Sequence, residues 1–326
     1  MRLPWASYKK NATNSLVEKK SASFQERKFS FGSEWLYYKL YCGVKSADKI
    51  LLEGIKPLAE ELLRRGIIDK WFFIRYNDPA FHIRLRFHIK DLDKIVDAVL
   101  LIRNHLLPFE EGTYIWKLQL DTYNREIERY GENTIELAET LFYYDSATLL
   151  KMLELTWGDE RERLRWIWGM KSVDELLNVF RFTVEDKLSL LTHLKDAFAT
   201  EFNMDKLLKT QLNNKYRENR KRIEQFFDTE DNEHNEYFPL IQILQERNES
   251  IAPIVSRLQG FNKNAELQVN LGSLLGSYIH MLLNRISTSN PRLHELVIYD
   301  FLFRHYQSLT ARAKNKIAEE NNVVTI

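Results

Sequence analysis

The stretch Trp71-Phe-Phe-Ile-Arg-Tyr-Asn-Asp-Pro-Ala-Phe-His-Ile-Arg-Leu-Arg-Phe87 contains two strand-like runs on either side of a turn at residues 77–79. Asn, Asp and Pro in that turn are residue types that interrupt strands and favour reversals. Side chains alternate along the second run, so Arg84, Arg86 and His88 should share one face and the apolar residues between them the other. Two guanidinium groups and an imidazole in a row suit a carboxylate or an oxyanion.

The elements around this stretch alternate between strand and helix. Period-two runs predict strands at 35–42, 71–76, 81–89 and 114–120, and helical spacing of apolar residues predicts helices at 46–65 and 92–107. The second helix is expected to end before Pro108. The resulting order, β-α-β-β-α-β, is typical of a ferredoxin-like split unit.

After Gly131 the sequence is almost wholly helical in character. Amphipathic segments are expected at 134–144, 146–157, 160–169, 173–180, 183–201, 204–228, 237–246, 251–260, 267–286 and 291–320. Such helices can share a core and pack on a sheet. The expected fold class is therefore α+β, a ferredoxin-like βαββαβ antiparallel sheet unit followed by and packed against a large helical bundle.

Three regions follow from these patterns. Residues 1–33 are rich in Lys, Ser and Asn and are expected to form a flexible basic N-terminal arm, with docking of an acidic partner peptide as an alternative role. Residues 34–130 form the sheet unit, and residues 131–326 form the helical region.

Composition limits the function classes. The chain has 326 residues and a formal net charge of +1, which argues against general nucleic-acid binding, so no direct tRNA or DNA binding is expected. A single cysteine, Cys42, excludes an intramolecular disulfide and a cysteine-based zinc site. The chain shows no secretory signal and no apolar run of the ~20 residues that a membrane span needs, so a cytoplasmic protein without membrane contact is expected. The pair His294-Glu295 lacks a third ligand at convincing spacing, so no metal is expected.

Four segments in order resemble the C-terminal domain of lantibiotic dehydratases, a domain that also occurs in free-standing thiopeptide-type bacteriocin biosynthesis proteins. They are the 71–86 stretch, the Glu-x-x-Arg-Tyr-Gly segment at 126–131, the Asp-Ser junction at 145–146 and the His-Met-x-x-Asn-Arg segment at 280–285. The resemblance spans about residues 34–303. One departure is Glu132, where the family often has a second glycine after Gly131.

The resemblance implies a lyase that eliminates glutamate from glutamylated serine or threonine of a ribosomally made precursor peptide, leaving dehydroalanine or dehydrobutyrine. Glutamylation would come from a separate, larger tRNA-dependent protein, because this chain is expected to be too short to contain that domain as well. The three regions would then form one elimination-type domain. A homodimer is left open.

The family pattern also implies site residues. Its catalytic positions fall on Arg84, Arg86, Arg129 and His280. Further positions are expected to bind substrate or to support the site: Arg75, Tyr76, His82, Glu126, Tyr130, Asn284 and Arg285. Of these, Arg75 and His82 could instead be structural, the two tyrosines could line a groove or only pack, and the last two residues could orient His280.

These residue types fit the implied chemistry. A histidine titrates near neutrality, so His280 can act as base for the α-proton or as acid for the leaving group, and the sequence leaves both open. Arginines stay protonated and can hold the glutamyl carboxylates or a developing oxyanion. Glu126 lies one helical turn before Arg129 and could orient it. This scheme requires no cofactor.

Two other functions remain open at this point. A protein of the same fold could catalyse a formal [4+2] cycloaddition between two dehydroalanines, as a pyridine synthase of thiopeptide biosynthesis. Alternatively, the chain could be a non-catalytic, peptide-binding subunit of the dehydratase. Retention of the arginines and His280 favours elimination.

Overall fold

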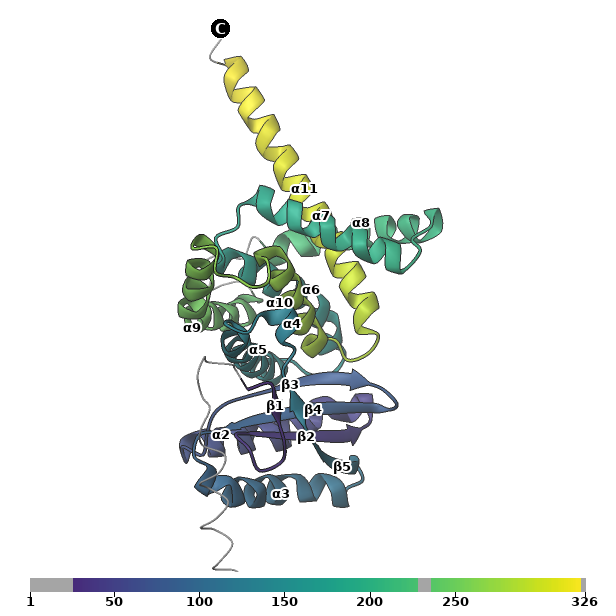
Figure 1. The fold of residues 1–326 in the computed structure, drawn as a ribbon. Helices are drawn as coiled ribbons and strands as arrows, with labels where there is room; N and C mark the ends of the chain where they lie inside the picture. Colours follow the sequence, from purple (N-terminus) through teal and green to yellow (C-terminus); the bar gives the residue numbers. More distant parts are fainter. Residues whose placement is uncertain (1–25, 228–235, 324–326) are drawn as a thin grey trace, which may run out of the picture.

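The computed structural model describes residues 26–227 and 236–323. A four-stranded sheet lies between two groups of helices (Figure 1). One group, which includes α3, covers the sheet from below in this view, and the larger group lies above it, against strand β3.

The sheet has the strand order of a ferredoxin-like unit. Its strands are β2 (Trp35–Cys42), β3 (Ile68–Asn77), β4 (Phe81–Ile89) and β5 (Ile115–Asp121), arranged in the order β3-β4-β2-β5. Each neighbouring pair is antiparallel. The apolar side chains at 83, 85, 87 and 89 of β4 are buried, so the expected alternation and the expected fold class are confirmed.

The helical connection between β2 and β3 is more irregular than expected. It consists of η1 (Val44–Ser46), α1 (Ala47–Lys49), a π-helical segment η2 (Ile50–Ile55) and α2 (Lys56–Arg64). Gly66 follows with a φ of +64°, a left-handed conformation that glycine adopts at little cost and that ends the helix.

The second helix of the unit continues past its expected end. After η3 (Leu92–Lys94), α3 (Ile95–Glu111) contains Pro108 in its last turn. Proline lacks one backbone donor, but Phe109 next to it is buried and holds that turn on the core. Gly54 of η2 leaves the space that the Phe109 ring occupies, since a Cβ there would lie 2.8 Å from the ring.

Part of the segment expected as a flexible arm belongs to the fold. Strand β1 (Lys28–Phe29) pairs with β6 (Tyr123–Asn124), and the Phe29 ring stacks on Tyr123 at 5.9 Å. The boundary expected at residue 33 is therefore too late, and residues 1–25 of the arm lie outside the described residues.

The helical region has fewer and longer helices than expected. After the short α4 (Ile127–Tyr130), the helices are α5 (Ile135–Leu155), α6 (Gly158–Val179), α7 (Val184–Glu201), α8 (Lys206–Phe227), α9 (Phe238–Lys263), α10 (Leu271–Ile286) and α11 (Pro291–Val323). The breaks expected within α5, α6 and α9 were wrong.

Tertiary contacts explain the continuity of α5. Asp145 and Ser146 look like a helix start in the sequence, yet both are buried inside α5. The Ser146 hydroxyl donates to the Phe142 carbonyl 2.7 Å away and accepts from the backbone N–H of Phe73 on β3. The Ser146 hydroxyl is therefore bonded within the helix and to the sheet, and it does not cap the start of a new helix.

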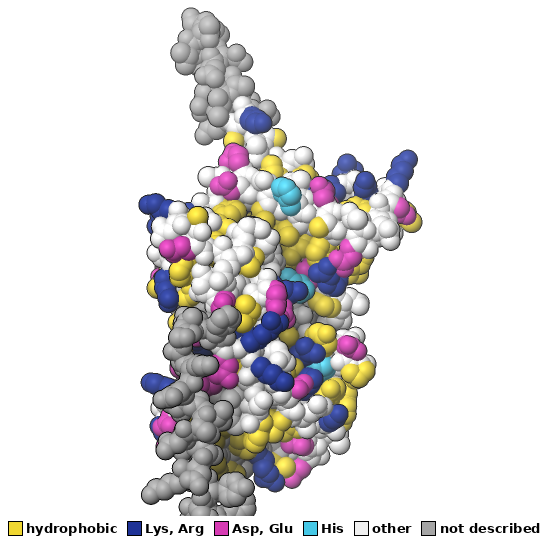
Figure 2. Space-filling model, in the orientation of Figure 1, with side chains coloured by type: hydrophobic (Ala, Val, Ile, Leu, Met, Phe, Trp, Pro, Cys, Tyr) yellow, Lys and Arg dark blue, Asp and Glu magenta, His cyan; other side chains and the backbone are white. Residues whose placement is uncertain are grey.

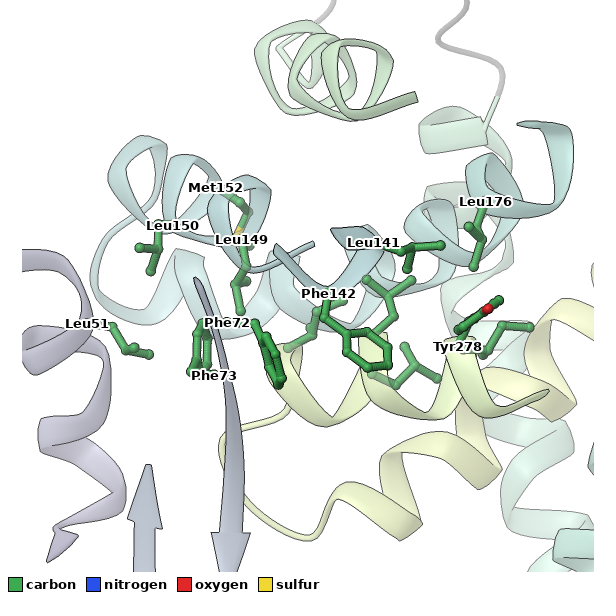
Figure 3. Packing of buried hydrophobic residues seen from close by; sticks show 14 of the residues in the cluster. Leu51, Phe72, Phe73, Leu141, Phe142, Leu149, Leu150, Met152, Leu176 and Tyr278 are labelled. Carbon is green, nitrogen blue, oxygen red and sulfur yellow. The ribbon is translucent and has the colours of Figure 1, made fainter. Parts of the chain in front are cut away.

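One hydrophobic core joins the sheet to the helical region. Figure 3 shows Phe72 of β3 facing Phe142 of α5, with Tyr278 of α10 beyond it, whereas Phe73 lies on the other side of the strand, toward Leu51. The rings of Phe72 and Phe142 meet edge to face at 5.5 Å. This core holds α10, and α4 next to it, against the β3 side of the sheet.

Candidate active site

The partly exposed His280 of α10 forms a pair with the buried Glu295 of α11. The Nδ1 atom of His280 lies 2.9 Å from Oε1 of Glu295, whose side chain is fully buried. The His280 side chain is 28% exposed. An ionised carboxylate only accepts hydrogen bonds, so Nδ1 donates and Nε2 is the nitrogen left for a ligand.

A groove of about 810 Å³ runs past this pair. An apolar flank comes from α7 and the residues just before it: Phe182, Leu190, Leu194, Ala197 and Phe198. Polar and charged side chains line the rest: Arg129, Asp186, Ser189, His193, Asn270, Ser273, Ser277, His280, Arg292, Glu295 and Tyr299. Figure 2 shows charged side chains gathered across the middle of this face, at the level of α4 and α10 in Figure 1, below hydrophobic side chains at the level of α7.

Arg129 reaches the groove from α4. It pairs with Glu126 at 3.2 Å, and both side chains are largely exposed. The next residue, Tyr130, is buried and stacks on Tyr278 of α10 at 5.8 Å, so it anchors α4 to α10. Burial raises the pKa of the Tyr130 hydroxyl. Arg129 and His280 are thus brought into one groove from positions far apart in the sequence.

The segment after α4 is held by the residues that precede α10. Gly131 has a φ of +76°, which favours glycine. The backbone N–H of Glu132 donates to Gln268, and the Asn133 amide donates to the Glu266 carbonyl at 2.8 Å. The departure from the family pattern at Glu132 leaves this anchoring intact, since it uses the backbone of that residue.

Arg84 lies on the sheet and does not line the groove. Its guanidinium carbon is 3.4 Å from the centre of the Tyr76 ring, and its Nε donates to Nε2 of His82 at 3.2 Å. His82 in turn donates from Nδ1 to the Ala80 carbonyl, and burial lowers the pKa of His82. Tyr76, His82 and Arg84 therefore form a local cluster on the face that the sequence predicted.

Arg86 shares this face but is buried. Its guanidinium group lies among the rings of Tyr37, Phe72 and Tyr123, at 4.4, 5.2 and 4.8 Å. Only 7% of its surface is exposed. The two arginines of β4 thus occupy different environments, one partly exposed and one enclosed by aromatic rings.

Three further expected residues connect α10 to the sheet. Asn284 bonds to the backbone of Arg75, and the Arg75 side chain donates to the Arg285 carbonyl and to Asp48. Arg285 is fully buried, and its side chain donates to the Met281 carbonyl at 2.7 Å. Burial lowers the pKa of Arg285 to about 10, against the opposing effect of nearby Asp145. None of Arg75, Asn284 and Arg285 lines the groove.

Arg86 does not line the groove. Ring contacts connect it to the residue that follows Arg129: the Arg86 guanidinium group lies 5.2 Å from the Phe72 ring, Phe72 meets Phe142 at 5.5 Å, and Phe142 meets Tyr130 at 5.3 Å. These aromatic rings therefore form a continuous series from the enclosed cation of the sheet to α4.

Glu295 is a residue that the sequence interpretation considered only as part of a metal-like pair with His294. The useful signal was its place one turn into the helix that follows the His280 helix, because two helices joined by a short turn pack side by side. In the described ranges, no three His, Cys, Asp or Glu side chains are grouped as a metal site would require. Over the same residues, no helix is long and apolar enough to cross a membrane.

Comparison with known proteins gives the family. The model of the family described as "Lantibiotic biosynthesis dehydratase C-term" matches residues 35–306. Among curated proteins, the chain is 30% identical over 188 residues to the subtilin biosynthesis protein SpaB of Bacillus subtilis, covering 57% of this chain and 18% of SpaB. It is 29% identical over 169 residues to the nisin biosynthesis protein NisB of Lactococcus lactis subsp. lactis, covering 52% of this chain and 16% of NisB. The matched segment is thus less than a fifth of either relative.

Solved structures share the fold. The tRNA-dependent lantibiotic dehydratase MibB from Microbispora sp. 107891 aligns with a TM-score of 0.69 and 20% identity, covering 90% of this chain and 29% of MibB. The pyridine synthase TbtD from thiomuracin biosynthesis aligns with a TM-score of 0.60 and 12% identity, covering 84% of this chain and 97% of TbtD. With the family model matched across most of its length, this chain belongs to the lantibiotic dehydratase C-terminal domain family.

Proposed function

We propose that this protein is a lyase that eliminates glutamate from glutamylated serine or threonine residues of a precursor peptide. The observation that carries the proposal is the joint presence of Arg129 and His280 in one groove. A proton-transfer group and an anion-binding group on the same surface are the two requirements of an elimination that expels a carboxylate.

The reaction balances with the residues in the groove. A base takes the α-proton of the modified residue, and the electron pair forms the Cα=Cβ double bond. The bond between Cβ and the ester oxygen breaks, and glutamate leaves as a carboxylate. His280, with Nε2 as its remaining nitrogen, is the proposed proton-transfer group, and Arg129 is the proposed partner of the departing carboxylate or of the enolate oxygen.

Arg84 and Arg86 have different parts in this proposal. Arg86 is enclosed by aromatic rings and does not line the groove, so it is proposed to supply positive potential from a distance and not to touch the substrate. Arg84 is partly exposed on the sheet and is proposed to hold a more distant part of the peptide.

The peptide is proposed to be glutamylated by a separate protein. The relatives SpaB and NisB match this chain over 18% and 16% of their length, so most of each relative lies outside the segment compared. In our proposal, the glutamylating protein acts in trans with this chain. The groove, with one apolar flank and one charged side, suits an extended peptide.

A second candidate function is the [4+2] cycloaddition of two dehydroalanines. The observation that favours it is the alignment with the pyridine synthase TbtD over 97% of that chain. Elimination remains the leading proposal because Arg129 and His280 share the groove.

One experiment tests the proposal. The purified protein is incubated with a synthetic glutamylated peptide, without tRNA or partner, and the peptide mass is followed. Loss of glutamic acid with formation of the dehydro residue supports elimination. An ester that stays intact while the peptide binds would refute it and leave a peptide-binding subunit. A peptide with two dehydroalanines that cyclises would assign the cycloaddition instead.

A further inference from the structure

We infer that Glu295 is a positioning residue that selects the tautomer of His280 and holds its imidazole toward the groove. The inference rests on the proposed elimination, in which His280 moves a proton. Oε1 of Glu295 lies 2.9 Å from Nδ1 of His280, and the carboxyl group is fully buried. A carboxylate at that distance requires the proton on Nδ1 and leaves the lone pair on Nε2.

The other oxygen of Glu295 is held as well. Oε2 accepts from the Tyr299 hydroxyl and from Nη1 of Arg292, each at 3.3 Å. Both donors lie on α11, as does Glu295. Contacts within one helix therefore fix the orientation of the carboxylate that accepts from His280 on α10. Burial and the Glu295 charge raise the pKa of the Tyr299 hydroxyl well above its usual value, so it remains a donor.

The arrangement continues to the surface through one more ion pair. Arg292 donates from Nε to Glu201 of α7 at 3.0 Å and reaches Glu295 with Nη1. Glu201 is 45% exposed, whereas Glu295 is buried. Glu295 is buried and contacts His280 directly, whereas Glu201 is exposed and contacts Arg292. Glu201 therefore provides a matched control.

The groups that face His280 come from three helices. Arg129 of α4, Asp186 and His193 of α7, and Arg292 and Glu295 of α11 line the same groove. Of these, Glu295 is the one for which a contact to the imidazole ring is found in the described part of the chain.

Replacing Glu295 by Gln removes the carboxylate that accepts from Nδ1 of His280. The amide can also donate to Nδ1, which favours the wrong tautomer. We expect kcat to fall about 100-fold with little change in KM, within the ~10²–10⁴-fold range of positioned acid–base catalysis.

The test compares three variants of the full chain on the glutamylated peptide. Glu295→Gln should show the loss of kcat, and Glu295→Asp, which keeps a carboxylate that can accept from Nδ1, should recover part of the rate. Glu201→Gln is the control, and we expect it to stay within about threefold of the wild type because its contact is an exposed ion pair. Thermal melting verifies that all three are folded.

A second measurement does not depend on turnover. In protein labelled with ¹⁵N-histidine, the His280 ring at pH 8 should carry its proton on Nδ1, and this preference should be lost in Glu295→Gln. An Nε2-protonated ring in the wild type would overturn the inference, as would a folded Glu295→Gln variant with unchanged kcat. If the wild type does not eliminate glutamate but its ring shows Nδ1–H, the proposed function fails while the assignment of the tautomer stands.

Discussion

The side chain of Asn284 closes a ring of two hydrogen bonds with the backbone of Arg75. Its Oδ1 accepts from the Arg75 N–H and its Nδ2 donates to the Arg75 carbonyl, both at 3.0 Å. Asn284 follows His280 by one turn of α10, so this contact sets the height of the histidine helix on β3. A motif asparagine thus ties the helix that carries His280 to the sheet.

Replacing Asn284 by Asp removes the donor and leaves the Arg75 carbonyl unpaired. We expect the free energy of unfolding to fall by ~1–3 kcal/mol, the usual effect of a buried polar group left without a partner. Urea denaturation measures it. Asn219→Asp is a matched control, since that amide donates only along its own helix, to Lys215, and should cost less than about 0.5 kcal/mol. Equal losses in the two variants would contradict the role of Asn284.

Substitutions of Arg129 and Glu126 should change kcat to different extents, although the two side chains form an ion pair. Arg129→Ala should lower kcat about 10²–10³-fold, because it removes one of the positive charges that line the groove. Glu126→Gln should change kcat less than about fivefold, since an exposed pair contributes little. Mass-spectrometric rates on the glutamylated peptide decide this. A large effect of Glu126→Gln would instead show that the carboxylate takes part in the reaction.

Substitutions of Arg84 and Arg86 should lower the free energy of unfolding to different extents. Arg86→Ala empties the space between three rings and should lower the free energy of unfolding by about 2–4 kcal/mol. Arg84→Ala loses one ring contact at a partly exposed site and should cost about 1 kcal/mol or less. Denaturant midpoints measure both, and Arg86→Lys should fall between them because it keeps charge but not planar stacking. The reverse order would argue against the enclosed position of Arg86.

The free energy of unfolding should depend on pH in the acidic range because of the Asp48 carboxylate. Burial alone would raise the pKa of Asp48, but Arg75 and Arg165 outweigh it and hold the pKa below its usual value. A lowered folded pKa gives stability that is present above the unfolded value, ~3.9, and is lost as pH falls through the folded value. Asp48→Asn should therefore cost about 3–5 kcal/mol at pH 7.

The difference between wild type and Asp48→Asn should begin to shrink as the pH falls below about 4, because the unfolded wild-type chain then takes up a proton at Asp48, and it should continue to shrink until the folded carboxyl group is protonated too. Urea unfolding at pH 7, 5 and 3 measures it. A difference that is constant across this range would show that the Asp48 charge does not contribute.

The sheet unit could be predicted closely from the sequence because its strands alternate in hydrophobicity and its turn residues are distinctive. Strand β4 begins and ends where the pattern of 81–89 placed it. The helix breaks were wrong where buried side chains override local signals. Arg247, in the break expected between 246 and 251, is buried and faces Asp145 of α5, so α9 continues through it.

The site could be predicted only in part. The segments that resemble the family identified Arg129 and His280 as candidates, and these two residues line the same groove. The alternation of β4 placed Arg84 and Arg86 on one face, but period alone cannot reveal that Tyr123, from a later strand, encloses Arg86. Glu295 was not recognised because its partner lies on another helix, and its place one turn into the helix after the His280 helix was the signal that pointed to the contact.

Ser146 also limits how this protein can be recombined with its relatives. Its hydroxyl meets the Phe73 backbone of β3 and Nε of Arg285 on α10, so one side chain joins three elements that are distant in the sequence. A chimera that exchanges the first 130 residues as a unit would replace β3 but keep α5 and α10, and so would join surfaces that were selected separately. Exchange of β3, α5 and α10 together preserves this junction, and it defines the block to be transplanted when the specificity of one family member is moved into another.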